Sequence, residues 1–199
     1  MRRWFLVAFL CAVSAGASDF PRELNVFVGA GRSLTSWHGS SSYRQVEFQF
    51  VGRPRFVARF LPRTDAGVSL AYSDIRQPRS WFGSLYGDPN DSVRGEWTYL
   101  FLRHGWRENA ATQPYVELGS GPMWSNRRVP AATSRFNFHS QLGIGTRLFA
   151  TSHPVFVVYR FSHISNLLFG PHNPGAHKRN PGWDVNTIMI GTRLHAFHR

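Results

Sequence analysis

From Phe20 onward, apolar and polar residues alternate with a period of two through almost the whole chain. Side chains two residues apart lie on the same side of a strand, so this repeat predicts β-strands with two chemically different faces. The alternation is sharpest over 136–149, where one face is mainly apolar and the other is polar or empty. The first face carries Phe136, Phe138, Ser140, Leu142, Ile144, Thr146 and Leu148, and the second carries Asn137, His139, Gln141, Gly143, Gly145 and Arg147.

The linkers between these segments are rich in Gly, Ser, Pro, Asn and Asp, and they divide the chain into strands. No linker is long enough to separate two domains, so residues 18–199 are expected to form one all-β domain. Two segments are less regular: 54–62 could extend a strand, and 79–86 could add a short one. The best parse gives eight strands, at 23–31, 43–51, 66–74, 94–106, 113–124, 136–149, 154–165 and 184–197.

The first residues have the pattern of a secretory signal peptide. Arg2 and Arg3 provide the positive start, residues 4–13 are apolar, and the small residues at 15–17 suit a cleavage site. The apolar run is too short for a membrane anchor helix, which requires about 20 residues. We therefore predict a signal peptide at 1–17. The single cysteine lies within it, so the mature chain is expected to have no disulfide and no cysteine metal site.

The whole chain carries a formal net charge of +12. Such an excess of Arg and Lys often indicates a nucleic-acid-binding protein. Export makes nucleic acid an unsuitable partner. A surface of phosphorylated, anionic glycolipid is the better match in that compartment.

An exported all-β chain could be a soluble sandwich, with apolar faces inward, or a membrane barrel, with these faces toward lipid. Two features favour the barrel. An even number of about eight strands closes a sheet without exposed edges, and aromatic residues occur near the predicted strand ends, as a membrane-interface girdle requires. The C-terminal residues 197–199 depart from the terminal aromatic of many such barrels. We predict an eight-stranded antiparallel outer-membrane β-barrel. The girdle candidates are Trp37, Trp81, Trp97, Trp106 and Trp124.

The last two predicted strands bring three reactive side chains together. His163 and Ser165 share one face with an apolar stripe, whereas the opposite face carries an arginine and a serine and is expected to line the lumen. A hairpin with the loop 166–183 places Asp184, at the start of the last strand, beside the end of the preceding one. The three side chains could then serve as a base, a nucleophile and an orienting acid on the lipid-facing surface.

Asn166 and Asn180 are amides near this group, and one oxyanion donor can contribute about 3–4 kcal/mol. A lone His-x-Ser on a strand is usually structural, and the chain has nine histidines. A non-catalytic structural or adhesion barrel in the outer membrane therefore remains an alternative, as does a soluble exported sandwich. No metal site is expected, because the other histidines lack partners at ligand spacing. The scattered histidines considered for this are His38, His104, His139 and His153.

The chain carries the run YRFSHISN at 159–166, then NPGWD at 180–184 and a final apolar strand. This combination resembles the lipid A 3-O-deacylase family (PagL-like proteins). The resemblance is clear over 134–197 and weaker over 20–130. It implies an eight-stranded outer-membrane barrel that needs no cofactor. It also implies a serine esterase that hydrolyses the ester-linked 3-hydroxyacyl chain at position 3 of lipid A, with lipopolysaccharide as its substrate.

The resemblance also implies roles for individual residues. The family's catalytic histidine and serine correspond to His163 and Ser165. Its acid corresponds to Asp184, where glutamate is a common alternative, and its amides correspond to Asn166 and Asn180.

Two features depart from the family pattern. A second block, HNPGAH at 172–177, contains Asn173, which is nearer to Ser165 in the spacing of the shorter family members. Using it would put His177 at the acid position, so Asn180 is preferred and Asn173 is kept in reserve. Leucines at 167–168 replace small residues there, which puts a backbone contribution to the oxyanion in doubt.

Two basic residues in the same loop are candidates for substrate binding. Lys178 and Arg179 could hold the phosphates on the glucosamines of lipid A, or they could simply form a solvated loop. The sequence leaves open whether two copies form a homodimer.

Overall fold

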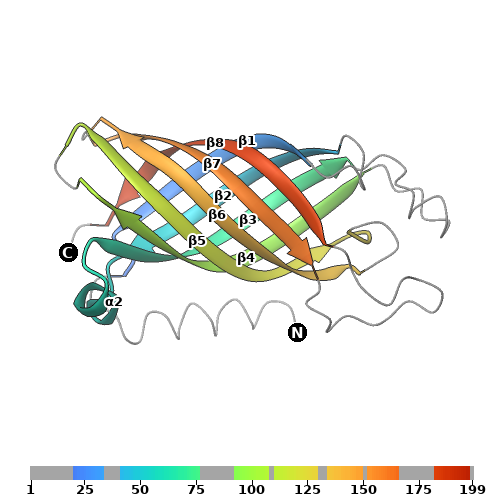
Figure 1. Ribbon diagram of the computed structural model, residues 1–199, viewed down its shortest axis with the longest axis horizontal. Helices are drawn as coiled ribbons and strands as arrows, with labels where there is room; N and C mark the ends of the chain where they lie inside the picture. Colours follow the sequence, from blue (N-terminus) through green and yellow to red (C-terminus); the bar gives the residue numbers. More distant parts are fainter. Residues whose placement is uncertain are drawn as a thin grey trace.

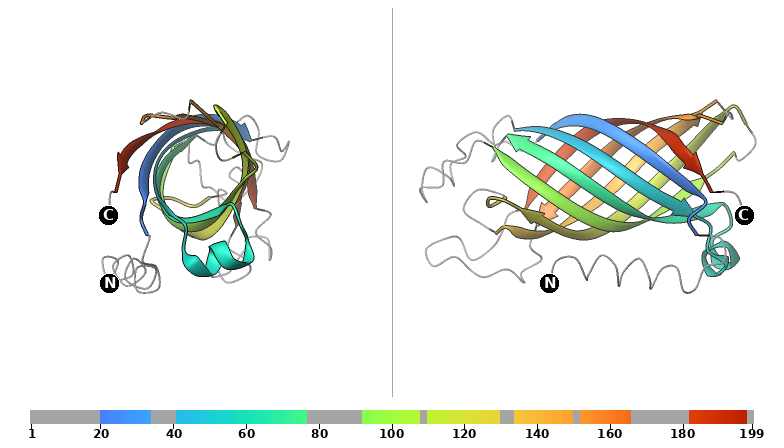
Figure 2. Two further views of the ribbon diagram at one scale, coloured as in Figure 1. Left: turned by 90° about the vertical axis from the view of Figure 1, so that its left-hand side faces the viewer. Right: turned by 180° about the vertical axis from the view of Figure 1, so that it is seen from behind.

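The computed structural model describes residues 20–33, 41–76, 92–107, 110–129, 134–149, 152–165 and 182–197. Eight strands form a closed antiparallel barrel, in which each strand pairs with the next and β1 pairs with β8 (Figures 1 and 2). The predicted fold class and strand count are confirmed, and every predicted strand end lies within two residues of the observed one. The strands are β1 (Glu23–Ser33), β2 (Ser42–Gly52), β3 (Thr64–Arg76), β4 (Val93–Gly105), β5 (Thr112–Ser125), β6 (Phe136–Leu148), β7 (Val155–Ser165) and β8 (Trp183–Ala196).

The barrel has two different ends. At one end, β1 begins and β8 finishes, and short connections join β2 to β3, β4 to β5 and β6 to β7. We call this the terminal end. At the opposite end, which we call the loop end, the chain passes from β1 to β2, from β3 to β4, from β5 to β6 and from β7 to β8. The segment 79–86, considered as a further strand, belongs to the β3–β4 connection and lies outside the described residues.

The connection between β2 and β3 corrects one expectation. Segment 54–62 does not extend a strand but contains a short helix, α2 (Arg55–Phe60), at the terminal end. Pro54 precedes it and has no N–H to donate to a β-ladder, so the strand ends there. The Pro54 carbonyl instead accepts a hydrogen bond of 3.0 Å from Ala58 N, which closes the first helical turn. Among the described residues, no helix is long and apolar enough to cross a membrane.

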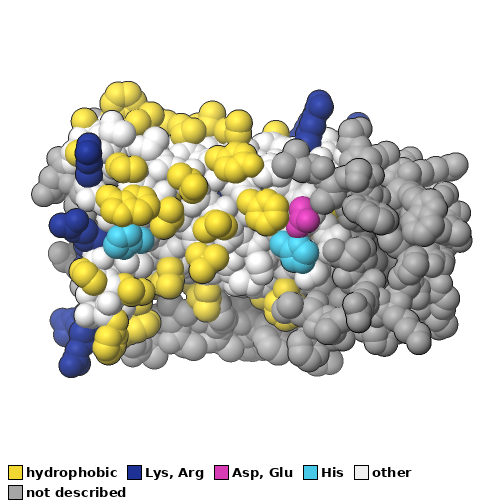
Figure 3. All heavy atoms as spheres, viewed as in Figure 1, with side chains coloured by type: hydrophobic (Ala, Val, Ile, Leu, Met, Phe, Trp, Pro, Cys, Tyr) yellow, Lys and Arg dark blue, Asp and Glu magenta, His cyan; other side chains and the backbone are white. Residues whose placement is uncertain are grey.

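The outer surface of the barrel is apolar, and its interior holds polar and charged side chains as well as apolar ones. Leu118, Ile144 and Ile188 are each at least 60% exposed on the outside, within a belt of other apolar side chains (Figure 3). In contrast, the buried residues include Glu47 and Arg160, which are fully enclosed. A soluble sandwich would bury the apolar face. A barrel that turns this face outward can place it against lipid and keep polar groups within its lumen.

A network of ion pairs and hydrogen bonds fills the middle of the lumen. Arg160 donates from Nη1 to Glu47 Oε2 at 2.6 Å and from Nη2 to Glu117 Oε1 at 2.9 Å. Glu117 also accepts a hydrogen bond of 2.6 Å from Arg103 Nη2. Two guanidinium groups therefore neutralise two carboxylates. The surrounding side chains complete the network with further hydrogen bonds: Gln45, Gln49, Ser69, Tyr99 and Gln141.

The aromatic girdle was predicted only in part. Trp106 and Trp124 are exposed near strand ends, as expected. Trp97 is wrong as a girdle residue, because it is buried in the lumen, where its ring centroid lies 3.4 Å from that of His139. Its odd position on β4 shares the inward face with Tyr99 and Arg103. The other two candidates, at 37 and 81, lie outside the described residues.

The buried network should determine much of the barrel's stability. We expect Glu47→Gln to lower the free energy of unfolding by about 3 kcal/mol, because removing one partner of a buried pair leaves an uncompensated charge. The measurement is the urea midpoint of the detergent-folded barrel, followed by the different gel mobilities of the folded and unfolded forms. Asp65→Asn is the matched control. It breaks the Arg53–Asp65 pair, whose side chains are 29% and 33% exposed, and exposed pairs contribute about 0–1 kcal/mol. Equal midpoints for the two variants would contradict the expectation.

Candidate active site

The alternation along β7 separates its reactive side chains from the lumen. Arg160 and Ser162 are buried inside the barrel, whereas Tyr159 and Phe161 are exposed on the outer surface. His163 follows on the outer face, two residues beyond Phe161, and its side chain is 43% exposed. It lies at the loop end of β7, where the apolar belt finishes. Figure 3 shows a histidine and an acidic side chain touching on this face.

His163 and Asp184 form a direct pair between neighbouring strands. The β7–β8 register places the two residues opposite one another, and Nδ1 of the imidazole lies 2.6 Å from Oδ1 of the carboxylate. An ionised carboxylate only accepts hydrogen bonds, so Nδ1 carries the proton. This arrangement leaves Nε2 with a lone pair that can take a proton from a hydroxyl. The pair thus has the chemistry of an oriented general base.

Ser165 is the last residue of β7 and shares the outer face with His163. The residue is 9% exposed, and its cross-strand partner is Phe138 on β6. Among the described residues, no hydrogen bond joins its hydroxyl to His163. Bonds between a nucleophile and its base are often long before substrate binds and shorten in the complex. The serine therefore occupies the position predicted from the strand repeat, without the closed geometry of a substrate complex.

A second outward serine lies beside the pair. Ser140 on β6 is directly opposite His163, on the side away from Asp184. The Ser140 hydroxyl lies 2.8 Å from that of Ser120, and within the described part of the chain it has no bond to the imidazole. Ser140 is thus a useful comparison for Ser165, since both hydroxyls lie near one imidazole on the same face.

Gly182 is a residue of this site that sequence reasoning passed over. It precedes β8 with a φ of 75°, in the left-handed region that favours glycine. A Cβ at this position would lie 2.2 Å from His163 Cε1 and 2.8 Å from Nε2. The backbone of Gly182 therefore packs directly against the imidazole. The glycine of the NPGWD run was the available signal, but only the positive φ shows why a side chain is excluded.

The remaining predicted site residues lie in the β7–β8 connection, outside the described residues. Within the described ranges, no group of three or more His, Cys, Asp or Glu side chains could hold a metal ion. The predicted site residues that lie outside these ranges are Asn166, Asn173, Asn180, Lys178 and Arg179.

A closed barrel with an apolar exterior and an imidazole–carboxylate pair facing outward belongs to the class of outer-membrane β-barrels that work at the lipid surface. Comparison with protein families makes the assignment specific. The model of the lipid A 3-O-deacylase (PagL) family matches residues 75–193, which is more than half of the chain and includes all of β4 to β7 and most of β8. The chain belongs to this family, whose members are hydrolases that act on lipid A in the outer membrane. A search of curated proteins found no match.

Solved structures show the same fold at low sequence identity. The crystal structure of the outer-membrane enzyme PagL aligns with a TM-score of 0.61 at 13% identity, covering 84% of this chain and 97% of that one. Neisserial surface protein A (NspA) aligns with a TM-score of 0.57 at 10% identity, covering 88% of this chain and 97% of that one. These similarities support the barrel fold, while the location in the outer membrane follows from membership of the family.

Replacing Gly182 should disturb the imidazole. We expect Gly182→Ala to displace His163 from Asp184, because the new Cβ would overlap the ring, and to lower lipid A deacylation about 100-fold. The measurement is the deacylation rate of the folded protein on purified lipid A. Gly105→Ala is the control, since its Cβ would come no closer than 3.9 Å to any neighbouring atom. If both variants kept the full rate, the contact between Gly182 and His163 would have no functional role.

Proposed function

We propose that this protein is a serine esterase that removes the 3-hydroxyacyl chain ester-linked at position 3 of lipid A. His163, Ser165 and Asp184 are its catalytic residues. The observation that supports this most directly is the 2.6 Å contact between His163 Nδ1 and Asp184 Oδ1 on the outer surface. Carboxylates and imidazoles facing lipid are costly, so a pair at this position calls for a function. Membership of the lipid A 3-O-deacylase family supplies the substrate.

The reaction follows from the roles of these groups. His163 Nε2 takes the proton of Ser165, and the hydroxyl oxygen attacks the ester carbonyl carbon. When the tetrahedral intermediate collapses, the bond to the sugar oxygen breaks, and His163 returns the proton to that oxygen. The acyl group stays on Ser165 until water, deprotonated by His163, releases it as a hydroxy fatty acid. Asp184 stabilises the imidazolium in both halves of the reaction.

The oxyanion needs donors that the loop can provide. The amide of Asn180 is the preferred donor, with Asn166 beside Ser165 as a second and Asn173 in reserve. Lys178 and Arg179 would bind the phosphates of the glucosamine units through charge-assisted hydrogen bonds.

The outward direction of the site suits a lipid substrate. Tyr159, Phe161 and Ile188 are exposed on the same face, on the side of the pair toward the middle of the barrel. An acyl chain attached to the scissile ester can remain in the bilayer beside these residues during attack. The enzyme therefore does not have to remove the chain from the membrane, which would cost about 0.8 kcal/mol for each methylene exposed.

A non-catalytic outer-membrane barrel is the alternative, and NspA shows that a surface protein can have this fold. Fold alone does not decide between them. The pairing of His163 with Asp184 favours the enzyme, because a purely structural barrel needs no oriented base on its lipid-facing side.

Ser165 should be essential, and Ser140 should not be. In cells that express the protein, we expect Ser165→Ala to abolish the loss of one hydroxyacyl chain from lipid A, as measured by mass spectrometry. Ser140→Ala removes a hydroxyl on the other side of the same imidazole and should leave the mass change intact. Activity that survives in Ser165→Ala but disappears in Ser140→Ala would assign the nucleophile to β6 and overturn the proposal.

The carboxylate at 184 should be needed for its charge. We expect Asp184→Asn to lower kcat about 10²–10⁴-fold, because the amide can neither stabilise the imidazolium nor hold Nδ1 protonated. Asp184→Glu keeps the charge, and glutamate is common at this position in the family pattern, so it should retain most of the activity. The rates are compared on lipid A micelles with folded protein. A fully active Asp184→Asn variant would place the acid elsewhere.

A further inference from the structure

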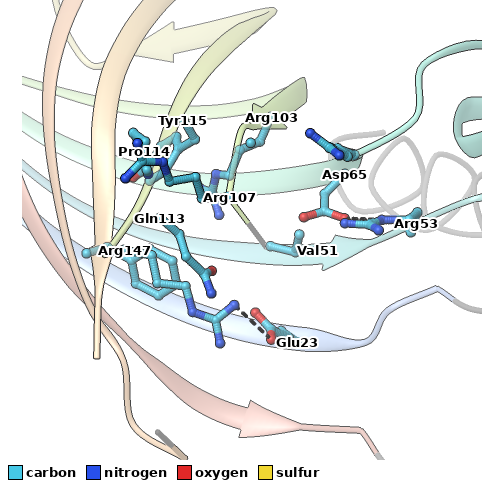
Figure 4. Close-up of a pocket in the computed structure, with 13 residues that line it drawn as sticks. Glu23, Val51, Arg53, Asp65, Arg103, Arg107, Gln113, Pro114, Tyr115 and Arg147 are labelled. Atoms are coloured by element: carbon cyan, nitrogen blue, oxygen red, sulfur yellow. Dashed lines mark hydrogen bonds and ion pairs between the residues drawn. The ribbon is translucent and has the colours of Figure 1, made fainter. Parts of the chain in front are cut away.

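A cavity opens into the lumen at the terminal end of the barrel, at the opposite end from His163 and Asp184. Its volume is about 140 Å³, and it is lined by residues from β1 to β7 and from the connections at this end of the barrel (Figure 4). A site for one water molecule requires only about 10–15 Å³. The cavity therefore has room for a small polyatomic ion and its bound water.

The cavity is lined by more cations than anions. Its charged side chains are two carboxylates, Glu23 and Asp65, and five guanidinium groups. Figure 4 shows Arg53, Arg107 and Arg147 reaching the same space from different elements. The lining therefore has an excess of three positive charges. The five arginines are Arg53, Arg63, Arg103, Arg107 and Arg147.

Ion pairs within the barrel account for only some of these cations. Arg103 is held by Glu117, and Arg53 by Asp65 at 2.9 Å. Glu23 is shared, because Arg193 Nη1 approaches it to 2.7 Å while Arg147 Nη1 lies at 3.8 Å. Arg147 Nε is buried without a hydrogen-bond partner.

Two of the arginines have no carboxylate partner among the described residues, namely Arg63 and Arg107. The side chain of Arg63 is engaged only weakly, through an Nη1 contact of 3.4 Å with the Trp106 carbonyl. Its backbone is held in an unusual conformation, with a φ of 64°. The Arg63 carbonyl accepts a hydrogen bond of 3.0 Å from Gly105 N, which ties the α2 connection to the end of β4. A strained non-glycine residue persists only where its surroundings hold it in place.

We propose that this cavity, lined by Arg63, Arg107 and Arg147, binds a phosphate group. Guanidinium groups present paired N–H donors that match the oxygens of phosphate, and several of them around one cavity suit a multiply charged anion. Short turns mark the periplasmic end of an outer-membrane barrel, so the phosphate would come from the periplasmic side. It could be free phosphate or the headgroup of a phospholipid in the inner leaflet. This site is separate from the esterase site and does not depend on the proposed function.

The test uses the full-length mature protein folded in octyl glucoside, whose headgroup carries no phosphate. Isothermal titration calorimetry at constant ionic strength measures the binding of inorganic phosphate and, separately, of a short-chain phosphatidylglycerol below its micelle concentration. We expect saturable binding of at least one probe. Arg107→Gln and Arg63→Gln should each weaken it about tenfold, which corresponds to the loss of one charge-assisted hydrogen bond.

Arg44→Gln is the matched control, because Arg44 is an exposed arginine near the loop end of β2. The substitution removes the same charge far from the cavity. It should leave binding unchanged. Binding of phosphate alone would identify a free anion as the ligand, and binding of phosphatidylglycerol would identify a lipid headgroup. The proposal is overturned if neither probe binds the wild type, if Arg63→Gln and Arg107→Gln bind as tightly as the wild type, or if Arg44→Gln weakens binding equally. Gel mobility of each variant verifies that the barrel is folded.

Discussion

Closure of the sheet through the β1–β8 pairing is the constraint on which the rest of this structure depends. Inside a hydrocarbon layer no water is available to an unpaired backbone group, and each such group costs several kcal/mol. The ring of eight strands leaves no free edge. Closure also fixes which side chains face lipid, because the alternation along each strand cannot shift by one residue without reversing every face. The same register of β7 therefore places His163 on the outside of the barrel and Arg160 on the inside.

The lumen network and the outer surface are therefore complementary. Glu47 and Glu117 come from β2 and β5, whereas Arg103 and Arg160 come from β4 and β7. The two ion pairs of Arg160 join β7 to β2 and β5 across the interior, and the pair of Arg103 with Glu117 joins the neighbouring strands β4 and β5. A rigid wall of this kind suits a site on its outer surface, since the distance between His163 and Asp184 depends on how β7 and β8 are held. A histidine that must stay aligned with its carboxylate partner needs such support.

The sequence was sufficient to predict the features that depend on the alternation of side chains between the two faces of a strand. The repeat of two located all eight strands, and the expected antiparallel hairpin over 166–183 correctly indicated that Asp184 would lie beside the end of β7. Helix α2 was missed, because six residues are too few for a helical period to be recognised. Trp97 was assigned to the girdle from its residue type, although its odd position on β4 places it in the lumen.

Long-range partners could not have been inferred in the same way. Glu47 and Arg160 are 113 residues apart, and their contact depends on closure of the ring through β1 and β8, which brings β2 and β7 within reach of one another across the lumen. The close approach of Gly182 to the imidazole likewise depends on a positive φ, which a glycine permits but does not announce. Local patterns thus identified the strands and their faces, while contacts across the barrel required coordinates.

The His163–Asp184 pair lies at the loop end of the barrel, and the cost of exposing a polar group to hydrocarbon explains this position. A carboxylate at the middle of the apolar belt would face hydrocarbon on every side. At the loop end of β7 and β8, the pair lies where the belt finishes, and its two groups satisfy one another at 2.6 Å. Depth decides the cost of a polar group on the lipid-facing surface, which falls toward zero near the interface. An ester of a membrane lipid also lies at that depth, between the headgroup and the chains. The depth at which the barrel tolerates this polar pair is therefore also the depth of such an ester, so the constraint that limits the cost of the pair is compatible with the proposed reaction at the lipid surface.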